Sequence, residues 1–237
     1  MYSRLPCELR HHIHTFCVQG SYDNEVIVRR TTNNGSVFLV RHSIDTHSYQ
    51  WIEDPTLLQL SPDRIGLNVA REMLATYYRT RTFKFVHEQL GVLQSFLGTD
   101  KFGLALRPAD HVRRLRLQIQ PFKYAQLRMS KPKEDEETRC FQALESLAVL
   151  QHPRSTVDIR VDLSQGFSDE EEYEELLGDA AGFIFRMAEL LNRLKMHGLN
   201  VGMTFEGTWY GRDGTKLCSD TISSLDECIS RMRIACQ

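Results

Sequence analysis

Two hydrophobic periods alternate along this chain, and together they predict its secondary structure. Apolar residues recur at every second position in four segments, as in strands that bury one face: 82–86, 112–120, 156–164 and 200–206. Segments with helical spacing lie between or after them: 88–97, 136–150, 168–197 and 224–235. Because strands alternate with helices, the pattern predicts largely parallel pairing through right-handed crossovers, and therefore an α/β fold.

The second face of each predicted strand is polar, whereas strands of a doubly wound sheet are apolar on both faces. The pattern therefore predicts helices on one face of the sheet and an open polar face on the other. This α/β (α+β) arrangement resembles a short leucine-rich-repeat-like sheet, although the sequence contains no exact repeat motif.

The first 60 residues show a different pattern. A short amphipathic helix is predicted over 6–18, with Pro6 in its first turn and apolar positions at Leu5, Leu9, Ile13 and Phe16. Segments 25–30 and 36–41 are β-rich and flank an Asn-Asn-Gly turn signal, so they predict a hairpin. Residues 42–56 show no period and predict a loop, which Trp51 and Ile52 would hold to the body.

Two longer helices complete the expected array. Ser61 as cap and Pro62 in the first turn begin a helix to about Thr80, whose predicted face is Ile65, Val69, Met73 and Tyr77. The helix over 168–197 should pack on the sheet through Tyr173, Leu177, Ala180, Ile184, Met187, Leu191 and Leu194. Residues 207–216 predict a closing hairpin. Ranges 1–60 and 61–237 are expected to form one continuous body.

Composition narrows the function classes. The chain has 237 residues, 41% of them hydrophobic and 25% charged, which is typical of a globular protein. Its formal net charge of −2 argues against a nucleic-acid partner. The sequence has no apolar stretch of membrane-spanning length, no apolar leader segment and six dispersed cysteines, so we expect no membrane partner and a cytoplasmic or nuclear location.

Candidate chemistry is sparse. The sequence has no nucleophile elbow, phosphate-binding loop or dinucleotide fingerprint, which favours a non-catalytic protein without a cofactor. Asp158 and Asp162 lie on one strand face, but four residues of strand span about 13 Å, too far for a carboxylate pair. With Arg160 between them and Arg114 and Arg116 on the neighbouring strand, they predict an ion ladder.

Two other groups of residues could be read as a metal site and as a nucleic-acid surface. In both cases an ordinary solvent-exposed surface is the better interpretation. The histidines at 11, 12 and 14 lie near Cys7 and Cys17, but their spacing does not complete a four-ligand metal site, so no metal is expected. A local basic zone lacks the aromatic pattern of a nucleic-acid surface and predicts solvated side chains: Arg79, Arg81, Lys84, Arg113, Arg114 and Arg116.

The N-terminal motif resembles an F-box. Leu5-Pro6-Cys7-Glu8-Leu9-Arg10, with Ile13 and Phe16, is similar to the start of a large fungal family of F-box-like proteins. Downstream, the pairs Arg71-Glu72 and Tyr77-Tyr78 and the segment Thr82-Phe83-Lys84-Phe85 resemble the family's second block. The likeness covers about residues 4–120, including Val112-Arg113-Arg114-Leu115, but here a hairpin and a long loop separate the first helix from the second.

The resemblance implies a substrate-recognition adaptor of a cullin-based ubiquitin ligase. It assigns binding of a Skp-type adaptor to Leu5, Pro6, Leu9, Ile13 and Phe16. Two alternatives stay open: an interaction or structural protein that buries this helix in its own core, and an enzyme with a scattered site. A binding protein would expose the helix as an apolar patch, and an enzyme would have a deep pocket with converging polar groups.

The polar sheet face is the second candidate surface. Because the predicted strands leave one face polar, we expect a protein partner to contact Lys84, Arg114, Arg116, Gln118, Asp158, Arg160 and Asp162.

Overall fold

The computed structural model describes residues 5–19, 24–31, 37–42, 51–121, 134–150, 152–162, 170–206, 209–210 and 216–218. Within these ranges a seven-stranded sheet has the order β3-β2-β1-β4-β5-β6-β7. Its strands are β1 (Glu25–Arg30), β2 (Val37–His42), β3 (Trp51–Glu53), β4 (Thr82–Phe85), β5 (Arg114–Ile119), β6 (Thr156–Asp162) and β7 (Asn200–Glu206).

The sheet is mostly parallel. Strands β1, β4, β5, β6 and β7 pair in parallel, while β2 and β3 add an antiparallel edge. Buried residues alternate along β4, β5 and β6, so one face is apolar and the other polar. The predicted α/β class, the hairpin and the one-sided parallel array are therefore confirmed, and the pairing of β1 with β4 places the hairpin in the same sheet.

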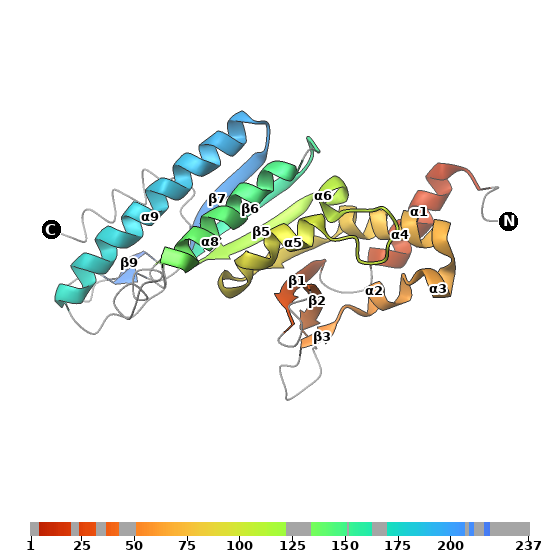
Figure 1. Ribbon diagram of the computed structural model, residues 1–237, viewed down its shortest axis with the longest axis horizontal. Helices are drawn as coiled ribbons and strands as arrows, with labels where there is room; N and C mark the ends of the chain where they lie inside the picture. The colour runs from red at the N-terminus through yellow and green to blue at the C-terminus, as the bar shows by residue number, and fades with distance from the viewer. Residues whose placement is uncertain are drawn as a thin grey trace.

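The helices cover the apolar face (Figure 1). The longer ones are α1 (Cys7–Gln19), α4 (Leu67–Thr80), α8 (Glu134–Glu145) and α9 (Glu170–Met196). Shorter helical segments connect them: α2 (Pro55–Gln59), α3 (Pro62–Ile65), η2 (His87–Val92), α5 (Leu93–Gly98), α6 (Pro108–His111) and η3 (Ser146–Val149). Figure 1 places α1 beside α4 at one end of the molecule and α9 with β7 at the other.

An aromatic cluster forms the core between α4, β4 and α5. Phe83 and Phe85 point to the same side of β4 because they are two residues apart. Their rings lie 5.0 Å and 5.5 Å from that of Phe96, measured between centroids. Tyr77 and Tyr78 pack on Phe83 at 5.9 Å and 5.8 Å. All five side chains are buried, so this cluster fixes α4 against the middle of the sheet.

The predicted loop over 42–56 is wrong for its second half. Residues 51–53 form the edge strand β3, paired with β2, and α2 begins at Pro55. Trp51 and Ile52 are 40% and 43% exposed, but they attach this segment to the sheet through their pairing with β2, and Trp51 also contacts Arg29. Leu57 and Leu60, each 1% exposed, bury the following helix in the core. A three-residue strand is too short to produce a recognisable period, which is why the pattern missed it.

The single helix predicted from Ser61 to Thr80 is also wrong. It is divided into α3 and α4 by Gly66, whose φ of 82° lies in the left-handed region that glycine adopts readily. The Ser61 side chain makes no capping hydrogen bond. Of the predicted face, Tyr77 is buried and Ile65 and Met73 pack against the core, while Val69 is half-buried and α4 buries Leu74 and Tyr78 more fully.

The remaining predicted elements agree closely with the structure or fall outside it. Segment 88–97 begins as the 3₁₀ helix η2 and continues as α5. The predicted stripe of α9 is buried wherever its side chains are described: Ala180, Ile184, Met187, Leu191 and Leu194. Strands β8 (Trp209–Tyr210) and β9 (Lys216–Cys218) form a separate antiparallel pair. The helix predicted at 224–235, together with Tyr173 and Leu177 as side chains, lies outside the described residues.

Across these ranges, each helix is too short or too polar to traverse a lipid bilayer.

Candidate protein-interaction surfaces

Helix α1 is held to the body of the protein mainly by polar side chains and by one buried valine. His14 and Val18, one turn apart, are 3% and 0% exposed. Arg10 donates a hydrogen bond to Glu72 of α4 over 2.8 Å, and His14 Nδ1 lies 3.8 Å from the other oxygen of that carboxylate. At the C-terminal end of the helix, the Val18 carbonyl oxygen accepts a hydrogen bond from Arg81. The side of α1 that faces the body is therefore held by hydrogen bonds and ion pairs as well as by one valine.

The opposite side of α1 is apolar and faces solvent. Its large apolar side chains are Leu5, Leu9, Ile13 and Phe16, which are 39%, 51%, 49% and 84% exposed. At 100° per residue Leu9, Ile13 and Phe16 fall within an arc of about 60°, on the far side of the helix from His14 and Val18, and Leu5 lies two residues before the helix begins. We name these four residues the α1 stripe. Pro6 is exposed beside them, so all five residues that the resemblance assigns to adaptor binding are accessible.

The burial of His14 makes the docking of α1 dependent on pH. Burial lowers the pKa of the His14 imidazole and outweighs the nearby Glu72 carboxylate, which acts in the other direction. The unfolded chain therefore binds this proton more readily than the folded one. The contribution of His14 to the free energy of unfolding is therefore complete above the ordinary histidine pKa, about 6.5. It is lost progressively as the pH falls below that value.

We expect the difference in unfolding free energy between wild type and His14→Gln to shrink between about pH 7.5 and about pH 5.5. Urea unfolding at the two pH values measures this difference. His12→Gln on the exposed part of α1 is the matched control. A constant difference for His14→Gln would show that its protonation is not linked to folding.

The second surface is the polar face of the sheet. Every residue that the sequence predicted there is exposed or half-buried: Lys84, Arg114, Arg116, Gln118, Asp158, Arg160 and Asp162. The register aligns Lys84, Arg116 and Asp158 in one row across β4, β5 and β6. The strands alone therefore determine which of these side chains are neighbours.

Most charges on this face are already paired. Asp158 Oδ2 accepts from Arg116 Nε and from Arg160 Nε, each over 3.1 Å. Arg116 also pairs with Glu25 of β1, and Arg160 Nη1 lies 3.0 Å from Glu206 of β7. The ladder thus crosses from one strand to the next, as the alternating charges predict. Partly exposed pairs of this kind contribute up to about 1 kcal/mol each, so the ladder sets side-chain positions more than it stabilises the fold.

A hollow at the edge of this face was missed by sequence reasoning. It has a volume of about 310 Å³ and is lined by Arg29, Trp51 and Gln118, among others. The Arg29 guanidinium carbon lies 4.7 Å from the Trp51 ring centroid, and His87 Nδ1 accepts a hydrogen bond from the Gln120 amide over 3.0 Å. Only the pairing of β3 with the hairpin brings Trp51 beside Arg29. Trp51 was the available signal in the sequence, but the aperiodic pattern around it predicts a loop.

The predicted basic zone is not one surface. Arg81 is fully buried and donates to Val18 and Asn24. Lys84, Arg114 and Arg116 lie on the polar sheet face. Arg79 belongs to α4 on the other side of the sheet. These cations lie in different parts of the molecule because some belong to a helix and others to strands, which place their side chains on different sides of the sheet.

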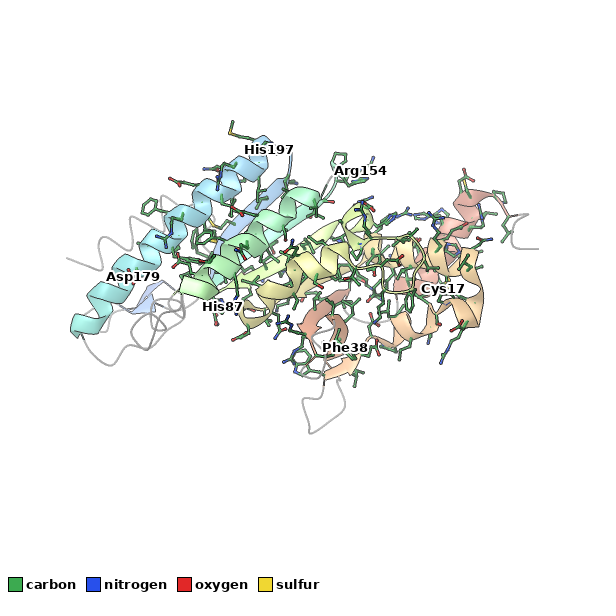
Figure 2. The ribbon with its side chains drawn as sticks, viewed as in Figure 1. Cys17, Phe38, His87, Arg154, Asp179 and His197 are labelled. Atoms are coloured by element: carbon green, nitrogen blue, oxygen red, sulfur yellow. The ribbon has the colours of Figure 1, made fainter. Side chains whose placement is uncertain are left out.

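The histidines and cysteines of α1 do not gather in space. His14 is buried, whereas His11, His12, Cys7 and Cys17 are exposed, and Figure 2 labels Cys17 on this helix. In the part of the chain that the structure describes, no three His, Cys, Asp or Glu side chains converge as a metal site would require.

The fold and these two surfaces define an α/β protein with a one-sided sheet and an apolar helix at its end. Neither protein-family models, nor curated proteins, nor solved structures yield a match to this chain. The F-box-like resemblance therefore remains a prediction from the residues that carry it.

Proposed function

We propose that this chain is a non-catalytic protein-interaction module that binds a Skp-type adaptor of a cullin-based ubiquitin ligase through the α1 stripe. The exposure of that stripe carries the proposal. An F-box-like helix that had become part of the core would bury Leu5, Leu9 and Ile13, but each of them is at least 39% exposed. This observation favours the binding protein over the structural alternative.

The way in which α1 is attached supports the same conclusion. Its contacts with α4 use His14, Val18 and the pair of Arg10 with Glu72, so the stripe is not needed for intramolecular packing. Apolar side chains in water are unfavourable by roughly 25 cal/mol per Å² of exposed area. A partner with a hydrophobic groove would remove this cost, which is the usual mode of binding for an amphipathic helix.

The polar sheet face is the proposed site for the protein to be ubiquitinated. It belongs to a different part of the fold from α1, so occupation of one surface leaves the other accessible. Lys84 and Arg114 form no ion pair with an acidic side chain of the described residues, and they are the cations available to an acidic partner. Arg116 and Arg160 are engaged in the ladder and would hold the surface in shape.

Co-purification of the full chain with a Skp-type adaptor tests the adaptor proposal. Replacing Leu9 and Ile13 together by alanine removes two neighbouring apolar side chains from the stripe. If each contributes about 1 kcal/mol, we expect affinity to fall at least about thirtyfold. The double variant Leu58→Ala and Leu67→Ala is a matched control, because both leucines are exposed, at 48% and 64%, and lie outside α1.

Circular dichroism and thermal unfolding establish that both double variants keep the fold. Loss of binding in the α1 variant, with full binding in the control, would support the proposal. Failure of the wild-type chain to bind the adaptor would overturn it, as would equal binding by the α1 variant.

A further inference from the structure

A basic hollow lies between α1, α4 and α6, on the helical side of the molecule. Its volume is about 470 Å³. The residues that define it are Arg71 and Arg79 of α4, Ala105 and Leu106 of the preceding loop, and His111 of α6. Arg10 and Glu72 close it on the side of α1. The α1 stripe points away from this region, so the hollow is separate from the proposed adaptor surface.

Two of the three arginines that line this hollow have no acidic partner among the described residues. Glu72 is engaged by Arg10 over 2.8 Å, and Asp110 by Arg107 in a two-pronged contact of 3.1 Å and 3.2 Å. Neither Arg71 nor Arg79 pairs with an acidic side chain within the described ranges. Glu72 and Asp110 are therefore already paired, and the charged side chains that line the hollow are three arginines, Arg10, Arg71 and Arg79, against one carboxylate, Glu72.

Further cations strengthen this field. Burial first, and then the charges of Arg79 and Arg154, lower the pKa of Arg113. Burial likewise lowers the pKa of His111, and Arg79 adds to the effect. Figure 2 shows Arg154 at the edge of the molecule beyond α6. Arg79 of α4, Arg113 directly before β5 and Arg154 in the turn before β6 thus contribute positive charge to one region.

Arg79 also has an unused donor. Its Nε atom is buried and has no hydrogen-bond partner among the described residues. A buried donor without a partner costs about 1–3 kcal/mol, and more when the group is charged. An anion in the hollow would supply the counter-charge that this guanidinium group lacks.

The loop that forms one wall is held in a fixed conformation. The Asp100 carboxylate accepts hydrogen bonds from the backbone amides of Leu104, over 3.0 Å, and Ala105, over 2.6 Å. Ala105 has a φ of 52°, a left-handed conformation that is unfavourable for alanine. Asp100 holds this turn and does not itself line the hollow. The wall is therefore formed before any ligand binds.

We propose that the basic hollow binds a phosphoryl group, with Arg71 and Arg79 as its principal donors. A guanidinium group presents a planar set of N–H donors that matches two oxygens of a phosphate, and two such groups suit a tetrahedral dianion better than a single carboxylate. The volume of the hollow exceeds that of phosphate itself, which leaves room for part of the molecule that carries it. This proposal does not depend on the adaptor function.

Calorimetric titration of the full chain with inorganic phosphate, at constant ionic strength set with sodium chloride, tests the site. We expect saturable binding and an increase in the unfolding temperature. Arg79→Gln should weaken phosphate binding at least about tenfold, because it removes a charge-assisted contact. Arg71→Gln, at an exposed position, should have a similar effect and serves as a second variant if Arg79→Gln does not fold.

Arg64→Gln is the matched control, since Arg64 is exposed on α3 and does not line the hollow. Titrations with a sugar phosphate and with a phosphoserine peptide distinguish a free metabolite from a phosphorylated side chain, and the tighter ligand identifies the source. Absence of saturable phosphate binding would overturn the proposal. Equal binding by wild type, Arg79→Gln and Arg71→Gln would overturn it as well.

Discussion

Replacing Arg81 by alanine should destabilise the protein by about 3 kcal/mol. Arg81 is fully buried directly after α4, and its guanidinium donates to the Val18 carbonyl at the end of α1 and, over 3.3 Å, to Asn24 before β1. It also lies over the Tyr77 ring, at 5.8 Å from the centroid. Alanine would remove these contacts, leave the carbonyl without this donor and create a cavity.

Urea unfolding, followed by far-ultraviolet circular dichroism, measures the loss. Arg81→Met is an informative second variant because it fills much of the same volume without donors. We expect it to retain part of the lost stability, since it also avoids the cost of burying a charge. Arg64→Ala on the surface of α3 is the control. A change of less than 1 kcal/mol in Arg81→Ala would contradict the role of Arg81 as the link between α1, β1 and α4.

The second large effect is expected at Asp54, which is also fully buried. Its carboxylate caps α2 by accepting from the Thr56 amide over 3.0 Å, and it accepts the Tyr77 hydroxyl over 2.7 Å. Asp54→Ala should cost about 2–4 kcal/mol, because a helix cap and a charge-assisted hydrogen bond are lost together. Tyr77→Phe removes only the hydroxyl and should cost less, although it leaves the carboxylate partly unsatisfied.

A double-mutant cycle separates the two contributions of Asp54. We expect a coupling energy between Asp54 and Tyr77 of at least about 0.5 kcal/mol, as for residues in direct contact. Thermal or urea unfolding of the two single variants and the double variant provides the values. Additive effects would mean that the hydroxyl contact contributes nothing, and that capping of α2 accounts for the whole loss.

The sheet was predictable because period-two patterns are local. Phe83 and Phe85, or Val157 and Ile159, reveal their buried face through spacing alone, without knowledge of any neighbour. The same spacing predicted the polar face, and the alternation of strands with helices predicted the largely parallel pairing. The break at Gly66 and the edge strand β3 were not predictable in this way. A single glycine is compatible with a continuous helix, and three residues are too few to show a period.

The candidate sites also differ in whether they depend on spacing within one element or on packing between elements. The sequence by itself determined the α/β class, the hairpin, the apolar positions of α1 and the membership of the polar sheet face, because each depends on spacing within one element. Only the tertiary structure decided that α1 turns its leucines to solvent and His14 inward, since that orientation depends on Glu72 and Arg81 of another segment. It also brought Arg71, Arg79 and His111 together, because the convergence of side chains from separate helices is a property of packing and leaves no pattern along the chain.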